Sequence, residues 1–265
     1  MKSSLAALTV RSLASALPET YELLHLETVD STNEQARRLA DQGIRVPYWI
    51  VADQQTAGRG RRGRVWDSPN GNLMTTLYLP VSLSPEEAGQ LSFVAGLALQ
   101  QTVAAYIGDG ATVSVKWPND VLIDGAKVSG ILLETASSRE NRIDWLAIGM
   151  GLNLHDFPSD TPYPASSVKA VVGTAPSNLD AAYQLAQDFE QFYQQWKNVG
   201  FASILMAWRH VAQNFGQPIA ARLENETVEG IFVDIDGTGA LVLETADGAR
   251  QTISAADIFF PNLTA

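Results

Sequence analysis

Two patterns of apolar residues divide the chain into expected strands and helices. Alternating or short continuous apolar runs predict strands, because successive side chains of a strand point to opposite faces. These segments are 21–29, 49–52, 73–79, 113–117, 121–123, 128–133 and 143–154. Apolar residues spaced three and four apart predict helices over 85–108, 179–196 and 201–208, and a Ser-x-x-Glu capping box followed by Gly43 predicts a helix over 31–43. Because the strands cluster into hairpins, the sequence predicts an α+β domain with a mixed, largely antiparallel sheet; a doubly wound fold is the alternative.

The pattern changes beyond Pro218. Short apolar runs follow, separated by Asp236-Gly237 and Asp247-Gly248, which are typical turn dipeptides. This spacing predicts a small β-barrel. We therefore expect a larger domain over residues 1–215 and a small C-terminal barrel over residues 216–265.

Composition and charge narrow the chemistry. The chain has 265 residues and no Cys, which excludes disulfides, thiolate zinc sites and a cysteine nucleophile. Its net charge of −11 repels nucleic acid and anionic membranes, so a basic patch has to be local. No run approaches the roughly 20 apolar residues of a membrane span, and Arg11 interrupts any secretory segment. We expect a cytoplasmic protein.

A basic loop stands out against this acidic background. Residues 58–64 read Gly-Arg-Gly-Arg-Arg-Gly-Arg and hold four of the 18 Lys and Arg residues. They match GxGxxG, but a turn and a strand follow in place of the helix that a dinucleotide site requires, and no phosphate-binding P-loop motif occurs. Glycine amides and guanidinium groups suit a loop that closes on a polyphosphate or acyl-phosphate. The alternative is a solvated basic loop.

A second polar segment, Lys116-Trp117-Pro118-Asn119-Asp120, precedes a predicted hairpin. If Asp124-Gly125 is a two-residue turn, Lys127 lies opposite Leu122, and Asp120 lies diagonally across from Lys127 on the same face. An ammonium and a carboxylate are then side by side. The alternative interpretation is an ordinary cross-strand ion pair, worth under about 1 kcal/mol.

Five motifs in order resemble the biotin protein ligase family over nearly the whole chain. They are Ser31-Thr32-Asn33, residues 55–66, residues 116–120, residues 127–132 and Gly149-Met150-Gly151-Leu152-Asn153. The resemblance implies a class II synthetase-like catalytic domain followed by an SH3-like barrel. It also implies an ATP-dependent ligase that activates biotin as biotinyl-5′-AMP and transfers it to a lysine of a biotin carboxyl carrier protein.

The resemblance also implies residue roles around biotin. Ser31, Thr32 and Gln55 are similar to residues that hydrogen-bond the ureido ring, with Asn33 beside them; Ser31 also reads as a helix cap in the Ser-x-x-Glu pattern. The backbone of the loop would close over biotin, and Lys127 would contact its carboxylate. The loop residues and the backbone-approach glycine in this set are Arg59, Gly60, Arg61 and Gly130.

Around the nucleotide, the resemblance implies that Lys116, Asn119, Asp120 and Asn153 lie near the phosphates and Mg²⁺. Arg61 corresponds to the arginine that retains the adenylate, and Asp120 would orient Mg²⁺ or help to deprotonate the acceptor lysine. Arg61, Lys127 and Asp120 are the expected catalytic residues. The acyl-adenylate chemistry needs cations and no enzyme nucleophile, which suits a chain without Cys.

Two alternatives remain from the sequence. One is a lipoate or octanoate ligase or transferase on the same scaffold, and the other is a non-catalytic module that binds biotin or nucleic acid through the basic loop. Family members with repressor activity carry a DNA-binding domain ahead of the catalytic domain, whereas here the Ser-Thr-Asn motif begins at residue 31. We therefore expect no nucleic acid and no membrane partner. A homodimer is compatible with the sequence.

Overall fold

A seven-stranded mixed sheet forms the centre of the larger domain. The computed structural model describes residues 17–18, 20–136, 142–161 and 163–259. The strands follow the order β1-β2-β3-β7-β6-β5-β4; β1 and β2 are parallel, and all other neighbours are antiparallel. Their bounds are β1 Glu22–Val29, β2 Tyr48–Gln55, β3 Leu73–Leu83, β4 Val113–Lys116, β5 Asp120–Ile123, β6 Ala126–Glu134 and β7 Ile143–Leu152. The predicted α+β fold with a largely antiparallel sheet is confirmed.

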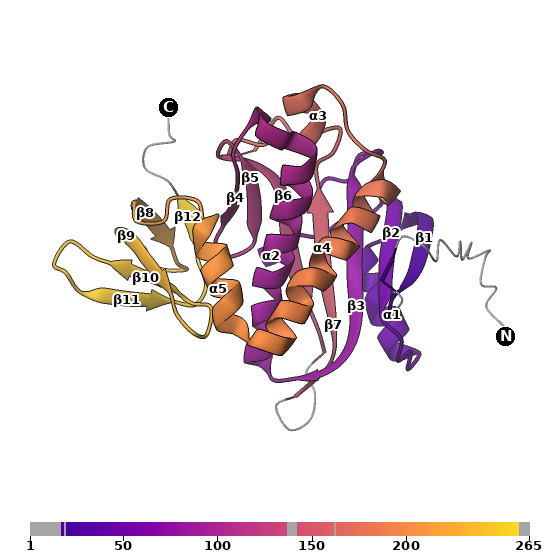
Figure 1. Ribbon diagram of the computed structural model, residues 1–265, viewed down its shortest axis with the longest axis horizontal. Helices are drawn as coiled ribbons and strands as arrows, with labels where there is room; N and C mark the ends of the chain where they lie inside the picture. The colour runs from indigo at the N-terminus through magenta and orange to yellow at the C-terminus, as the bar shows by residue number, and fades with distance from the viewer. Residues whose placement is uncertain (1–16, 19, 137–141, 162, 260–265) are drawn as a thin grey trace.

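Helices cover the two faces of this sheet unequally. On one face, α2 (Pro85–Ile107) packs against the sheet and against α4 (Asn178–Val199) and α5 (Phe201–His210), as Figure 1 shows. On the other face, α1 (Thr32–Asp41) packs on β2, β3 and β7. Side chains of β2 alternate accordingly, with Trp49 in the larger apolar cluster and Ile50 in the smaller one under α1. The short helix α3 (Val168–Val172) was not predicted.

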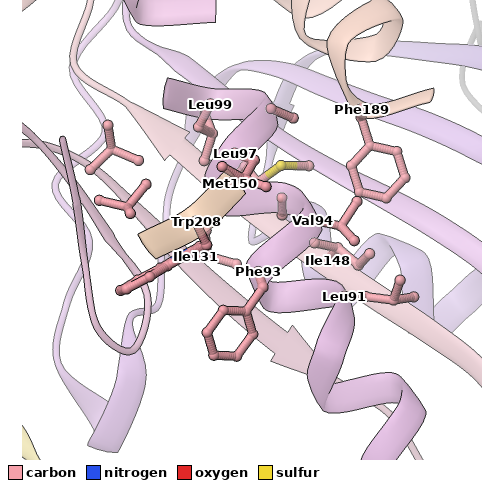
Figure 2. Close-up of a cluster of buried hydrophobic side chains, with 14 of the residues drawn as sticks. Leu91, Phe93, Val94, Leu97, Leu99, Ile131, Ile148, Met150, Phe189 and Trp208 are labelled. Atoms are coloured by element: carbon pink, nitrogen blue, oxygen red, sulfur yellow. The ribbon is translucent and has the colours of Figure 1, made fainter. Parts of the chain in front are cut away.

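Helix α2 is the core helix of the protein. Within the described part of the chain it is the one helix long and apolar enough to cross a membrane by length and composition, but much of it is buried inside the fold. Its side chains pack between β6 and β7 on one side and Phe189 of α4 and Trp208 of α5 on the other (Figure 2). A capping box starts the helix: Ser84 Oγ accepts the Glu87 amide, and Glu87 accepts the Ser84 amide at 2.7 Å. Burial on several sides explains its nearly continuous apolar sequence.

The C-terminal module is a five-stranded antiparallel sheet in the order β11-β10-β9-β8-β12. Its strands are β8 Pro218–Arg222, β9 Thr227–Ile235, β10 Leu241–Glu244, β11 Arg250–Ile253 and β12 Asp257–Phe259. The small antiparallel β module expected beyond Pro218 is confirmed. Trp117 of the larger domain contacts this module: its Nε1 donates a hydrogen bond to the carbonyl of Gly239 at 3.0 Å. Buried side chains of both sheets form one continuous cluster, and the division at residues 215 and 216 stays a prediction.

Candidate active site

A cavity of about 730 Å³ opens between the sheet, the Gly/Arg loop (residues 58–65) and the C-terminal module. Every site residue predicted from the sequence lines it. These residues are Ser31, Thr32, Asn33, Gln55, Arg59, Gly60, Arg61, Lys116, Asn119, Asp120, Lys127, Gly130 and Asn153. They come from positions more than 120 residues apart in the chain, and the sheet brings them together because β6 lies between β5 and β7.

The first turn of α1 forms one wall of the cavity. Gln55, at the end of β2, accepts from the Thr32 amide at 2.8 Å and from Thr32 Oγ1 at 3.1 Å, and it donates to Ser68 at 3.1 Å. The Ser-x-x-Glu prediction was wrong in one respect, because the Ser31 side chain makes no capping bond; Asp30 accepts the Ser31 amide instead. Ser31 is buried and its side chain is not committed to the helix end, which suits a ligand contact.

The Gly/Arg loop is a short hairpin over this wall. Arg59 and Val65 pair as an antiparallel bridge at its neck, and the tip forms a single 3₁₀ turn, η1 (Arg61–Gly63). Arg62 and Gly63 both have positive φ, at 55° and 72°. Glycine adopts that conformation readily, whereas an arginine there is strained unless neighbouring groups hold it. The close spacing of glycine and arginine in the sequence therefore reflects a tight turn as well as a basic patch.

Acidic residues form ion pairs with arginines of the loop at its neck and at its tip. Arg59 Nη2 lies 3.3 Å from Glu34 of α1 and 3.2 Å from Glu134 of β6. At the tip, Arg62 lies 3.3 Å from Asp257 of β12, and Arg64 forms an ion pair with the same carboxylate. The loop is thus held by the larger domain at its neck and by the C-terminal module at its tip. None of these ion pairs could be inferred from sequence spacing.

Arg61 points from the loop toward Asn119. Its Nη1 donates to Asn119 Oδ1 at 3.1 Å, and Asn119 in turn donates to the carbonyl of Ile131 at 2.8 Å. Burial lowers the pKa of Arg61 from its usual value, and the charge of Arg62 adds to this effect. Because the guanidinium is partly desolvated beside a second cation, a bound anion would offset the free-energy cost of that desolvation and repulsion.

The Lys127 hairpin has the predicted geometry. Asp124 and Gly125 form its turn with φ values of 47° and 82°, and Lys127 pairs with Leu122. A bulge after Val121 then shifts the register. Lys127 Nζ lies 2.6 Å from Asp120 Oδ1, so the diagonal ion pair predicted from the sequence is confirmed.

Trp66 is a cavity residue that sequence reasoning did not select. Its ring lies over the backbone of Gly130 and Gly151, where a Cβ would come within 3.1 Å and 2.3 Å of ring atoms. Lys127 Nζ lies 5.7 Å from the ring centroid. The sequence does contain a signal for this contact: a tryptophan directly follows the loop, and two predicted strands each contain a glycine on which its ring could pack.

One side of the cavity combines cations with aromatic rings from both modules. Lys116 Nζ lies 4.9 Å from the centroid of Tyr163, which packs against Phe259 at 5.3 Å, and Arg222 covers Phe259 at 4.1 Å. Burial lowers the pKa of Lys116 below 10.5, although Asp120 opposes this shift. Arg222 is one of only two basic residues in the C-terminal module, and it lines the cavity.

Asn153 supports the end of β7. It donates from Nδ2 to the carbonyl of Ser166 at 3.1 Å, and its amide bonds to the carbonyl of Val128 at 2.8 Å. The side chain is buried, so its first role is to hold the segment around residue 166 against the sheet. That segment follows a stretch of cavity residues, which are Pro158, Asp160, Thr161, Tyr163, Pro164 and Ala165.

The cavity is cationic within an acidic protein. Six of its residues are Lys or Arg and four are Asp, a balance of +2 against −11 for the chain. The cations are Arg59, Arg61, Arg64, Lys116, Lys127 and Arg222. Among the residues that the structure describes, no group of three or more His, Asp or Glu could by itself hold a metal ion. The charge balance indicates an anionic ligand.

Comparison with known proteins identifies the family. The chain is 41% identical over 240 residues to biotin–[acetyl-CoA-carboxylase] ligase from Paracoccus denitrificans, covering 89% of this chain and 99% of that protein. The chain belongs to the biotin protein ligase family. Two family models match, the Biotin/lipoate A/B protein ligase family at residues 26–153 and the Biotin protein ligase C terminal domain at residues 215–260.

A second relative and a solved structure support this family assignment. The bifunctional ligase/repressor BirA of Bacillus spizizenii is 34% identical over 88% of this chain and 72% of its own length. A solved biotin protein ligase from Aquifex aeolicus, in complex with biotin and ATP, superimposes with a TM-score of 0.75 at 26% identity. The superposition covers 89% of this chain and 98% of that one. The fold predicted from the motifs is therefore confirmed.

Proposed function

We propose that this protein is a biotin–[biotin carboxyl carrier protein] ligase, which activates biotin with ATP and transfers it to a lysine of the carrier. The observation that carries the proposal is the 41% identity to a biotin–[acetyl-CoA-carboxylase] ligase over 99% of that relative, together with a single cavity that gathers all the expected residues. The Aquifex aeolicus relative was solved with biotin and ATP bound, which supports the same pair of substrates here.

The first step joins biotin to AMP. A biotin carboxylate oxygen attacks the α-phosphorus of ATP, and the bond to the leaving diphosphate breaks. Negative charge grows on the diphosphate and on the phosphoryl oxygens, so catalysis depends on cations that are already in place. We assign Lys127 to the biotin carboxylate and Lys116, Asn119 and Arg61 to the phosphates. The +2 balance of the cavity supports this assignment.

In the second step, a carrier lysine attacks the carbonyl of the adenylate, an amide forms, and AMP leaves. The lysine has to lose a proton to become a nucleophile. Asp120, 2.6 Å from Lys127, is the carboxylate that we assign to this end of the cavity. It holds the Lys127 ammonium toward the ligand and attracts the positive charge of the incoming lysine.

Biotin's ring system would occupy the other end. Ser31, Thr32 and Gln55 supply hydroxyl and amide groups there, and Gly130, which has no Cβ, lets the Trp66 ring and the Lys127 side chain lie against the backbone of β6. Asn33 lies beside them, and the backbone from Arg59 to Arg61 covers the position. The Mg²⁺ that accompanies ATP suits a site with few carboxylates, because Mg²⁺ takes most of its ligands from phosphates and water. Asp120 and Asn153 would lie nearest to it.

The proposal extends to partner and location. The carboxyl carrier protein follows from the relative's name, and the net charge of −11 supports a protein that neither binds nucleic acid nor lies on an anionic membrane. We propose a cytoplasmic location for the same reason. A homodimer stays a prediction.

The test is biotin-dependent diphosphate exchange, followed by transfer to a purified carrier domain. We expect exchange with biotin and ATP, little exchange with lipoate or octanoate, and one biotin added to the carrier lysine by mass spectrometry. Exchange that responds to lipoate and not to biotin would contradict the proposal and favour the lipoate alternative. Biotin binding without exchange would favour a non-catalytic module.

A further inference from the structure

A carboxylate behind the cavity links two parts of the site. Glu134 ends β6 and, unlike the residues assigned above, does not appear among the described residues that line the cavity. Its Oε2 accepts from Asn33 Nδ2 at 2.8 Å and from Arg59 Nη2 at 3.2 Å. One oxygen thus bonds the first turn of α1 and the neck of the Gly/Arg loop. The proposed chemistry gives Glu134 no role.

The Asn33 side chain is fully oriented by the protein. Its Nδ2 donates to the carbonyl of Leu132 at 3.3 Å as well as to Glu134, so both amide hydrogens are used. Its Oδ1 accepts from Thr76 Oγ1 at 2.6 Å. A Cβ on Gly149 would lie 2.3 Å from this oxygen, so the amide is wedged directly against β7. Asn33 is buried, and loss of an acceptor would leave part of its amide unsatisfied.

The orientation of Asn33 is passed on to the ligand-facing wall. Thr76 Oγ1 also lies 2.7 Å from Thr32 Oγ1 and shares its one hydroxyl hydrogen between Asn33 and Thr32, and the Thr32 amide donates to Gln55 at 2.8 Å. A chain of polar contacts therefore runs from Glu134 through Asn33 and Thr76 to Thr32. Buried networks of this kind fix geometry most firmly when every member has a partner.

Arg59 shows the second effect of the same carboxylate. Its guanidinium lies between Glu34 and Glu134, at 3.3 Å and 3.2 Å, and its side chain is 45% exposed. Two half-buried carboxylates share this contact, so loss of either one leaves the other in place. The hydrogen bond from buried Asn33 to Glu134 has no such substitute. The other acceptor of Asn33 Nδ2, the carbonyl of Leu132, lies farther away at 3.3 Å.

We propose that Glu134 is a positioning residue for biotin: through Asn33 it orders the Thr32–Gln55 wall, and through Arg59 it holds the neck of the loop over that wall. The inference rests on the proposed function. It predicts that loss of the Asn33 bond weakens biotin binding, whereas loss of the Arg59 contact alone affects only retention of the adenylate.

Three variants separate these effects. Glu134→Met keeps the side-chain length but accepts neither bond. Glu134→Gln keeps an oxygen acceptor for Asn33 but loses the charge opposite Arg59. Glu34→Gln, the matched control, removes a carboxylate from Arg59 and does not touch Asn33. Biotin affinity is measured by calorimetry, ATP affinity in parallel, and adenylate retention by the rate at which labelled adenylate leaves the protein.

We expect Glu134→Met to bind biotin about tenfold or more weakly, the scale of a hydrogen bond to a charged group, with ATP affinity changed less than threefold. Glu134→Gln should recover biotin affinity to within about threefold of the wild type, because the Asn33 bond returns. Glu134→Gln and Glu34→Gln should both release the adenylate about two- to fivefold faster, the scale of an exposed ion pair.

Other results would overturn the inference. Biotin affinity of Glu134→Met within twofold of the wild type excludes the positioning role, and so does an equal loss of biotin and ATP affinity. A Glu134→Gln variant as weak as Glu134→Met shows that the Asn33 bond is not the link. If Glu134→Met does not fold, Glu134→Gln and Glu34→Gln still test the inference. Weaker biotin binding in both variants would show that the Arg59 contact, and not the Asn33 bond, controls biotin affinity. A wild type without biotin binding refutes the proposed function itself.

Discussion

Replacing Lys127 with alanine should damage catalysis far more than folding. The backbone around Lys127 keeps its bonds in the variant, because the Lys127 amide donates to the carbonyl of Pro164 and the Lys127 carbonyl accepts from Ser166. The side chain is one-third exposed, and its ion pair with Asp120 is cross-strand. Removing such a pair costs about 1 kcal/mol. For a chain of this size that is a loss of about 2–4 °C in Tm.

The catalytic loss is larger because the same ammonium is assigned to the biotin carboxylate and to the charge of the reacting anhydride. A hydrogen bond to a charged group contributes about 1.5–3 kcal/mol. That corresponds to about ten- to more than a hundredfold in rate or affinity. Asp120 adds to the loss, because without Lys127 its carboxylate repels the incoming anion. The expected result is therefore at least a tenfold fall in exchange with a shift of a few degrees in Tm.

The assay is biotin-dependent diphosphate exchange, with thermal melting on the same preparations. Lys169→Ala is the matched control, since Lys169 is an exposed lysine on α3 that does not line the cavity. It should melt and exchange like the wild type. A Lys127→Ala protein that melts many degrees lower but exchanges almost normally would refute the reasoning, and the hairpin could then no longer be assigned to the biotin carboxylate.

Three further predictions concern the cations of the cavity. Arg61→Gly should leave the fold intact and release the adenylate, so labelling of bystander lysines rises; unchanged specificity would contradict the role of Arg61. Asp257→Asn should free the loop tip, increasing tryptic cleavage at residues 59–64 without ligand, and biotin with ATP should suppress it; equal cleavage in both states counts against a closing loop. Burial lowers the pKa of Lys116, so ATP affinity should fall as pH rises through that pKa, and Lys116→Arg should move the fall to higher pH in calorimetry.

The sign of the Lys116 effect on stability follows from the same shift. Its pKa in the folded protein lies below the 10.5 of an ordinary lysine, so the unfolded chain binds the proton more tightly. The contribution of Lys116 to folding therefore becomes more favourable as pH rises from the folded pKa toward 10.5. Bound phosphate opposes the shift by favouring the charged form. Nucleotide binding at alkaline pH should accordingly take up a proton.

Features that depend on local sequence were predictable. The hairpin at Asp124-Gly125 follows from turn chemistry, and its register places Lys127 beside Asp120 without knowledge of the rest of the fold. Helix α2 follows from its apolar spacing, whereas the Ser84 capping box that starts it was found in the structure. The Ser31 side chain makes no capping bond, although Ser31 is the N-cap residue of α1, and the Ser31 amide donates to Asp30. Capping patterns indicate where a helix starts, but not which side chain closes it.

Contacts between distant segments were not predictable. Glu134 and Asp257 meet the loop, and Trp66 meets Gly130 and Gly151, only because β6, β7 and the C-terminal module lie next to the loop in the fold. A carboxylate at the end of a strand carries no signal of its partner, and the pairing of Asp257 with Arg64 spans 193 residues. The family resemblance selected residues that line the cavity but not those that hold them in place.

The Gly149-Met150-Gly151 motif shows how one short sequence serves both faces of the sheet. Because side chains alternate along a strand, Met150 enters the core against α2 (Figure 2), while the two glycines face the cavity. Gly151 pairs with Gly130 on β6, and the ring of Trp66 lies on that bare patch. At Gly149 the space a Cβ would fill is taken by the Asn33 amide. Glycine is thus required at both positions because polar and aromatic groups from remote segments occupy the space of a Cβ. The motif in the sequence therefore reflects a contact that forms only in the folded protein.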